Sequence, residues 1–202
     1  TACAIRRIVK SLPPPAPLKL SREGFDLIAE LKLRSPAVGQ LRAVASEDVP
    51  ARVLDYADGG AAAVSVLTEP SRFDGSMSHL EKAARALLRR AVPAMRKDFL
   101  VDPYQVLEAR AAGAGGVLVI LRMLPRAALE ALVDEALEQR MFVLLETFDE
   151  AEIDLARDLL EARRGHDDRL LVGVNCRDLV TLQVVPGRLE ALASRLPQGA
   201  PR

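Results

Sequence analysis

Tryptophan is absent from this 202-residue sequence, and aromatic residues make up only 3% of it. Half of the residues are hydrophobic, so a core has to be built mainly from Leu, Val, Ala and Ile. A chain of this length is ample for one domain and short for two. With 28% charged residues, the composition is typical of a soluble globular protein.

An excess of charge of one sign is also absent. Lys plus Arg and Asp plus Glu number 28 each, which gives a formal net charge of zero. Proteins that bind nucleic acids or membrane surfaces through the electrostatic field of their net charge are usually strongly basic. Neither partner is therefore expected. Any anionic ligand has to be held by a local site.

Cysteine is scarce, and long apolar runs are missing. Cys3 and Cys176 are too few and too far apart in the sequence for a disulfide framework or a metal site. No run approaches the about 20 apolar residues of a membrane span, and the first residues do not resemble a secretion signal. We therefore expect a cytoplasmic protein without a metal.

Proline is concentrated near the amino terminus, at Pro13, Pro14, Pro15 and Pro17. Proline fixes φ and removes a backbone donor, so residues 1–26 are predicted to be an extended arm or linker. A lead-in that packs on the following domain is the simpler interpretation. The remaining residues, 27–202, are predicted to form that domain.

From residue 27 onward, short β-rich runs alternate with longer segments of helical period. The predicted strands are 27–32, 62–67, 93–98, 116–121, 141–146 and 169–175, and the predicted helices are 46–60, 78–90, 102–113, 124–140, 148–165 and 186–196. The strands are near-continuous apolar runs, as in a parallel sheet buried on both faces. This alternation predicts an α/β fold of about six βα units.

Three residues are predicted to begin helices. Ser46, Asp102 and Asp149 stand where an N-cap is needed, and Pro103 follows Asp102 in the first turn. No GxGxxG follows the first strand, so the dinucleotide-binding signature is missing. Periodicity alone does not separate an open sheet from a closed barrel.

Polar residues occur at the ends of several predicted strands. Glu30 and Lys32 end the first strand, two residues apart and so on one face, and the others are Lys97, Glu146 and Asn175. In a barrel these ends form the active site. Taken singly, each has a simpler explanation, such as a solvated charge, a surface pair of Lys97 with Asp98, or a turn cap at Asn175. Their recurrence predicts a pocket for acid–base chemistry on an anionic substrate, without naming it.

Several segments resemble the indole-3-glycerol phosphate synthase family. The strings are IAELKLRSPAVG (28–39), GGAAAVSVLTEPSRFDGS (59–76), PAMRKDFLVDPYQVLEARAAGA (93–114), VGVNCRDL (172–179) and, more loosely, MFVLLETFDEAE (141–152). The match runs in order from about residue 27 to 196. The fold it implies is a (β/α)₈ TIM barrel. Phosphoribosylanthranilate isomerase, another phosphosugar barrel, fits less well because of Lys97 and the Glu30/Lys32 pair.

The resemblance implies an enzyme of tryptophan biosynthesis, a carboxy-lyase that uses no cofactor or metal. Its substrate would be 1-(2-carboxyphenylamino)-1-deoxyribulose 5-phosphate, which closes to indole-3-glycerol phosphate with loss of CO₂ and water. Lys97 would be the general acid and Glu146 would serve the later dehydration. Glu30 and Asn175 would orient these groups and the substrate, and Lys32 would contact its anionic groups.

The resemblance also implies a set of substrate-binding residues. Phe73, Phe99 and Leu118 would hold the anthranilate ring, although both phenylalanines could instead be ordinary core residues. Ser35 and Arg177 match family positions in the pocket. Ser65 also matches and would support the pocket, whereas Cys176 is not expected to be catalytic.

Some features depart from the family pattern. The usual SPS is Ser35-Pro36-Ala37, and Gly115 replaces the Asp of a Gly-Ala-Asp turn, a change expected to affect only that turn. The amino-terminal arm is shorter than the family's helical extension. Because the family continues with two further βα units, we expect a C-terminally truncated barrel. The alternative to the enzyme is therefore an inactive barrel that acts as a binding or assembly module, with homo-oligomers formed through its open edges.

Overall fold

The computed structural model describes residues 2–21, 24–41, 47–166 and 168–197. Six parallel strands form one sheet in the order β1-β4-β5-β6-β7-β8. They are β1 (Ile28–Leu31), β4 (Ala63–Leu67), β5 (Ala94–Lys97), β6 (Gly116–Ile120), β7 (Phe142–Thr147) and β8 (Leu170–Val174). Every strand predicted from the sequence is present.

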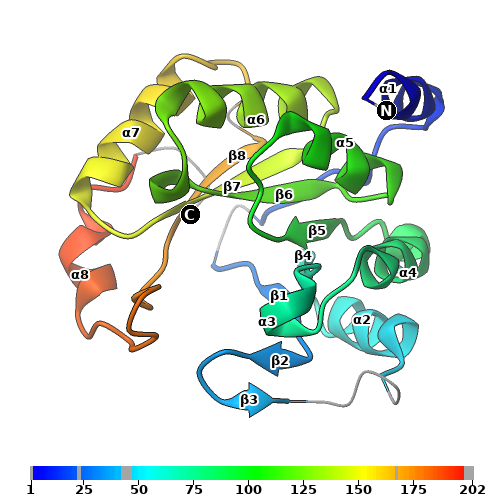
Figure 1. The fold of residues 1–202 in the computed structure, drawn as a ribbon, viewed down its shortest axis with the longest axis horizontal. Helices are drawn as coiled ribbons and strands as arrows, with labels where there is room; N and C mark the ends of the chain where they lie inside the picture. Colours follow the sequence, from blue (N-terminus) through cyan, green and yellow to red (C-terminus); the bar gives the residue numbers. More distant parts are fainter. Residues whose placement is uncertain (1, 22–23, 42–46, 167, 198–202) are drawn as a thin grey trace.

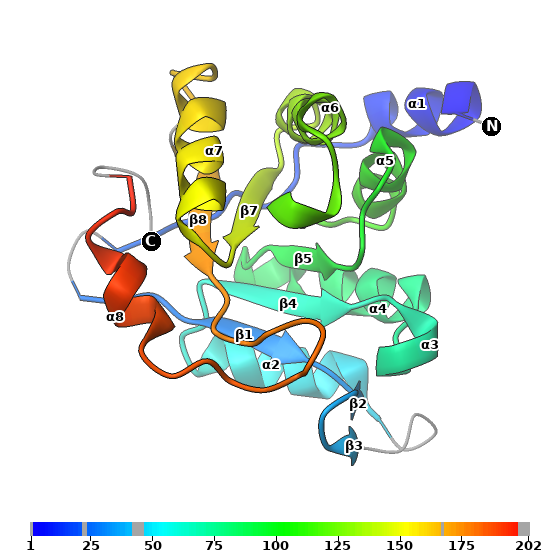
Figure 2. The ribbon, with the colours of Figure 1, turned by 60° about the vertical axis from the view of Figure 1, so that its left-hand side comes forward.

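The main helices follow the strands in alternation. They are α2 (Val49–Asp58), α4 (Met77–Leu87), α5 (Pro103–Ala111), α6 (Arg126–Glu138), α7 (Glu150–Glu161) and α8 (Arg188–Ala193). Figure 1 shows α2, α4, α5, α6 and α7 along the outside of a curved sheet. The α/β prediction is confirmed, and the sheet is part of a barrel, with β1 and β8 at its two edges among the described strands (Figure 2).

Short elements that the periodicity did not predict lie between these units. They are the hairpin β2 (Arg34–Ser35) with β3 (Gly39–Gln40), the turn of helix α3 (Pro70–Phe73), and the 3₁₀ turns η2 (Leu88–Arg90) and η3 (Leu121–Met123). The hairpin and α3 follow β1 and β4, at the carboxyl ends of these strands. Loops at this end of a parallel barrel usually build the binding site.

The core has two layers, one on each face of the sheet. On the outer face, residues such as Val64, Val117 and Val143 are fully buried against the helices. On the inner face, Ala63, Met95, Phe142 and Leu171 form a separate cluster near the amino ends of the strands. Burial on both faces explains why the strands are nearly continuous apolar runs.

The amino-terminal arm differs from the extended segment expected over residues 1–26. Ala2–Ser11 forms helix α1, which packs on α5 with Val9 buried. This segment contains no proline, and the proline-rich part begins only at Pro13, so nothing prevents a helix before it. From Pro13 to Leu20 the arm has no helix or strand, as expected.

The arm packs on the barrel, in line with the simpler interpretation. Leu18 and Leu20 contact the inner cluster and so fill the amino end of the barrel interior. The arm passes so close to the sheet that a Cβ at Gly115 would lie 2.6 Å from the carbonyl oxygen of Ala16. The Gly115 departure therefore affects more than its own turn, because it allows the arm to cross.

Two of the three predicted helix caps are confirmed. The Asp102 carboxylate accepts from the Tyr104 amide, and Gln105 completes a capping box. The Asp149 carboxylate accepts from the amide of Glu152. The Ser46 cap is wrong: Asp48 caps α2 instead, and Ser46 lies outside the described residues. Among the helices of the described residues, none has the length and apolar character to cross a bilayer.

Candidate active site

A cavity of about 240 Å³ opens at the carboxyl ends of the strands. Every site residue predicted from the sequence lines it: Glu30, Lys32, Ser35, Phe73, Lys97, Phe99, Leu118, Glu146, Asn175 and Arg177. These residues come from six strands, β1, β4, β5, β6, β7 and β8, or from the loops that follow them. Tertiary structure thus brings together side chains spread over about 150 positions of sequence.

Glu30 lies between the two lysines of the cavity. Its Oε2 accepts a hydrogen bond from Lys97 Nζ at 2.8 Å, and its Oε1 accepts one from Lys32 Nζ. Burial by itself would raise the pKa of Glu30, but the two ammonium groups together lower it below its usual value. Glu30 is therefore an anion that fixes the position of Lys97 across the sheet.

Glu146 is in a different electrostatic environment on the opposite strand, β7. Burial raises the pKa of its carboxyl group, and this effect exceeds the opposing influence of Lys97 and the Asn175 side chain. A carboxylic acid with a raised pKa can hold a proton and donate it near neutral pH. Of these two groups, Glu30 is held as an anion, and Glu146 is suited to proton transfer.

Asn175 follows β8, and hydrogen bonds of its backbone groups fix its position. Its amide donates to the Thr147 carbonyl oxygen at 2.8 Å, and its carbonyl oxygen accepts from Arg188 at 2.8 Å. Its side-chain oxygen accepts from the Arg177 amide, and Arg177 Nη1 donates to the Leu182 carbonyl oxygen. These contacts order the loop that forms one wall of the cavity.

The apolar wall of the cavity is built from Phe73, Phe99 and Leu118. The two rings lie 6.3 Å apart between centroids with a 48° angle between their planes. Leu118 is buried beneath Phe99 in a cluster with Ile120 and Phe148. Both rings are only partly buried and line the cavity, so they are not ordinary core residues. A flat aromatic ligand would fit such a wall.

Two serines lie near these groups and differ in their hydrogen bonding. Ser35, in the β2–β3 hairpin, accepts a hydrogen bond from the Ala37 amide. Ser65 is paired in register with Glu30 and Met95. Its hydroxyl oxygen is buried and has no hydrogen-bond partner among the described residues. Ser65 therefore lies beside Glu30 on the neighbouring strand.

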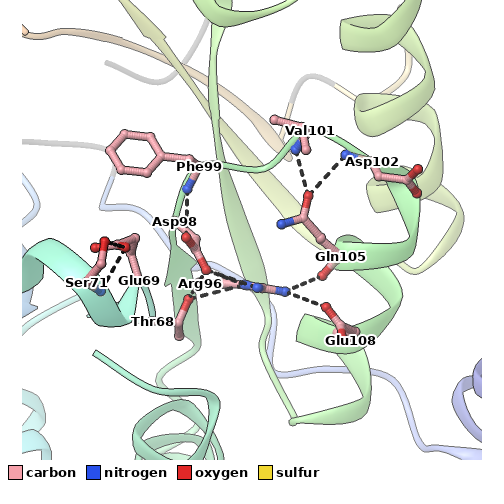
Figure 3. Close-up of polar contacts among 10 residues, drawn as sticks. All are labelled: Thr68, Glu69, Ser71, Arg96, Asp98, Phe99, Val101, Asp102, Gln105 and Glu108. Atoms are coloured by element: carbon pink, nitrogen blue, oxygen red, sulfur yellow. Dashed lines mark hydrogen bonds and ion pairs between the residues drawn. The ribbon is translucent and has the colours of Figure 1, made fainter. Parts of the chain in front are cut away.

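Sequence reasoning missed the network that fixes the end of β5 (Figure 3). Arg96 is 5% exposed and donates to Asp98 at 3.0 Å, to Thr68 at 3.2 Å and to the Gln105 carbonyl oxygen at 2.8 Å. Asp98 also accepts from Thr68 and from the Phe99 amide. Since neighbouring residues of a strand point to opposite faces, this network holds Lys97 toward the cavity. In the sequence, the opposite charges of Arg96 and Asp98 on either side of Lys97 could have indicated this network.

Other lining residues are less directly linked to chemistry. Glu69 lines the cavity, but its carboxylate caps α3 through the amides of Ser71 and Arg72. Leu67, Leu179 and Leu182 add apolar surface. Within the described parts of the chain, no group of three or more His, Cys, Asp or Glu side chains is placed to hold a metal ion.

Solved structures of very different sequence share the fold. A citrate synthase variant, SbnG, superposes with a TM-score of 0.54 at 14% identity, covering 84% of this chain and 69% of that one. A thiamine phosphate pyrophosphorylase from Pyrococcus furiosus gives 0.50 at 16% identity, covering 74% and 63%. These similarities concern the fold alone.

Sequence comparisons are more specific. An indole-3-glycerol phosphate synthase from Mycobacterium leprae is 42% identical over 193 residues, which cover 93% of this chain and 66% of that protein. The relative from Streptomyces coelicolor is 41% identical over 178 residues, covering 88% and 61%. This chain thus spans about two thirds of the length of these curated relatives. The family model for indole-3-glycerol phosphate synthase matches residues 9–200, and the chain belongs to that family.

Proposed function

We propose that the chain catalyses the ring closure of 1-(2-carboxyphenylamino)-1-deoxyribulose 5-phosphate to indole-3-glycerol phosphate. The observation that carries this proposal is the cavity in which Lys97 and Lys32 share the Glu30 carboxylate, opposite Glu146. The substrate carries a carboxylate and a phosphate, and the cavity offers two cations. It also carries an aromatic ring, and the cavity offers an apolar wall.

In the first step, the ring carbon that bears the carboxylate forms a bond to the substrate carbonyl carbon. The carbonyl oxygen takes up a proton, and Lys97 is the donor that we assign. CO₂ then leaves, and its bonding electrons restore the aromatic ring. The partly apolar surroundings of Phe99 and Leu118 solvate a carboxylate poorly and so favour its loss.

In the second step, the new hydroxyl group leaves as water and the neighbouring carbon loses a proton. Glu146 is the acid–base group that we assign, because burial keeps its pKa raised. Glu30 and Asn175 act as positioning groups. Ser35 and Arg177, which also line the cavity, are assigned to substrate binding together with Lys32.

The direct test is a fluorescence assay for indole-3-glycerol phosphate with this chain, after circular dichroism has shown that the sample is folded. Formation of product is the expected result. A folded sample that forms no product would overturn the assignment of activity to this chain. Titration of a non-reactive substrate analogue would then distinguish a binding module from a chain without function at this cavity.

We also propose that the two sheet edges mediate association with a second copy of the chain. Strands β1 and β8 each pair with only one neighbour in the described part of the chain. Phe25 and Val180, which are each 90% exposed, lie close in sequence to these strands. Unpaired edges and exposed apolar residues favour association. Sedimentation velocity should show a dimer, and a monomer at all concentrations would contradict this.

Finally, we propose a cytoplasmic location. Cys3 and Cys176 are both free thiols, and a reducing compartment maintains this state.

A further inference from the structure

A second cavity, of about 300 Å³, lies at the opposite end of the sheet. Its walls come from α1, the proline-rich arm, the last turn of α5 and the turn after α6. The lining residues are Arg6, Val9, Lys10, Leu12, Pro14, Pro15, Arg110, Glu138, Gln139 and Arg140. Figures 1 and 2 both show α1 beside α5, on the side away from the β2–β3 hairpin.

Arg110 is the most buried cation that lines this cavity. Only 5% of it is exposed, and its Nη2 donates to the carbonyl oxygen of Pro13. No carboxylate forms an ion pair with it within the described residues. Burial lowers the pKa of Arg110. A buried guanidinium group has five N–H donors and is normally matched by an anion.

The remaining charges of the cavity also leave positive charge in excess. Arg6 is neutralised by the Glu135 carboxylate. Its Nη1 donates to Oε1 at 3.2 Å, and its Nη2 donates to Oε2 at a shorter distance. Glu138 is the acidic residue of the lining. Lys10 and Arg140 are exposed, and neither forms an ion pair with any residue that the structure describes. Three cations thus face one carboxylate.

Helix ends account for only part of this arrangement. Lys10, Arg110 and Arg140 lie at or just beyond the last turns of α1, α5 and α6, where a helix carries about half a negative charge. The carbonyl oxygens of Glu135 and Leu137 at the end of α6 accept from the amides of Gln139 and Arg140. A carbonyl oxygen carries only a partial negative charge, so these groups do not give Arg110 a full anionic partner.

We propose that this cavity binds a phosphate-type oxyanion, either free or carried by a small organic phosphate. Guanidinium groups match the oxygens of phosphate with paired hydrogen bonds, and Lys10 would add a mobile cation. The prolines of the arm form a rigid wall, so ligand binding should cost little conformational entropy. Since α1 and the arm form one side of the cavity, the ligand would also hold the arm on α5 and α6.

The experiment is a titration of the ¹⁵N-labelled chain with inorganic phosphate and, separately, with ribose 5-phosphate, at constant ionic strength set by chloride. We expect saturable shifts of the amides of Gln139 and Arg140. The test variant is Lys10→Gln with Arg140→Asn, because both side chains are exposed and Asn tolerates the positive φ of 60° at position 140. Affinity should fall about tenfold or more.

Two controls separate this site from the active site. Lys32→Ala alters the cation of the other cavity and should leave the shifts near Arg140 unchanged. Lys82→Ala with Arg164→Ala removes two exposed charges elsewhere and should also have no effect. Tighter binding of the sugar phosphate would identify an organic ligand, and equal affinity would identify the free ion. Shifts that chloride reproduces, that survive in the test variant, or that disappear with Lys32→Ala would overturn the proposal.

Discussion

The two ends of the barrel handle positive charge in different ways. At the carboxyl ends of the strands, Lys97 and Lys32 both hydrogen bond to Glu30. At the amino ends, Arg110 is buried more deeply, and its partner among the described residues is a backbone carbonyl oxygen alone. The interior also differs, since Leu18 and Leu20 fill the amino end whereas the carboxyl end contains the cavity.

This difference predicts that stability and function depend on different parts of the fold. The amino end is packed by the arm and contributes apolar burial. The carboxyl end contains the cavity, and its charged side chains form ion pairs with one another and hydrogen bonds with the backbone. Substitutions of partly exposed cavity residues such as Lys97 should therefore change activity with little loss of stability. Substitutions in the buried network behind β5 or at the amino end should lower stability instead.

The largest expected effect is that of Lys97→Ala. Loss of the assigned proton donor should lower turnover by about 10²–10⁴-fold. The fold should remain intact, because Glu30 keeps Lys32 as a partner. Steady-state kinetics together with thermal unfolding would measure both quantities, and Lys82→Ala serves as the exposed control. Near-normal turnover in Lys97→Ala would refute its role.

Arg96→Met should cause the largest loss of stability at the carboxyl end. It leaves the mostly buried Asp98 without its cation, a change that typically costs about 3–5 kcal/mol. The matched control is Arg90→Met, which breaks an exposed pair with Asp58 and should cost far less stability, because solvent screens exposed charges. Urea unfolding of both variants gives the comparison. Equal losses would show that the network of Figure 3 does not fix β5.

At the amino end, Gly115→Asp should displace the arm. A Cβ at this position would lie 2.6 Å from both the Ala16 oxygen and Pro93 Cβ, and such crowding typically costs about 1–3 kcal/mol. Limited proteolysis should cut the arm of the variant faster than that of the parent chain. The rate of turnover per folded molecule should stay the same. A large loss of turnover would mean that the two ends are coupled.

The smallest effect concerns the dependence of stability on pH. Burial raises the pKa of Glu146 above its usual value of 4.5, so the folded state keeps a proton that the unfolded chain releases. This stabilisation is present below pH 4.5 and is lost as the pH rises through the raised value. Glu146→Gln should therefore flatten the decline of the urea midpoint above pH 4.5.

Glu30 provides the opposite case as a control. Its pKa is lowered by the two lysines, so its stabilisation is present above pH 4.5 and is lost as the pH falls. Glu30→Gln should flatten the acid side of the profile and leave the alkaline side unchanged. Identical profiles for the two variants would show that the two carboxyl groups do not differ in environment.

The sequence allowed much of this site to be predicted because of its periodicity. Glu30, Lys97 and Glu146 each end a short apolar run, and the ends of parallel strands must meet at one edge of a barrel. It did not reveal Arg96, because a charged residue inside a strand can be read as exposed unless its partners are known. Those partners, Thr68, Gln105 and Glu108, come from two other elements.

The sequence by itself determined the order of strands and helices along the chain, the family of the chain and the predicted site residues that line the cavity at the carboxyl ends of the strands. Local patterns carry this information, since hydrophobic periodicity, helix caps and short motifs each involve residues that are close in sequence. Tertiary structure alone decided the course of the arm, the close approach at Gly115 and the burial of Arg110 beside α1. These depend on contacts such as that between Arg110 and Pro13, 97 positions apart, and no local pattern specifies which distant surfaces will meet.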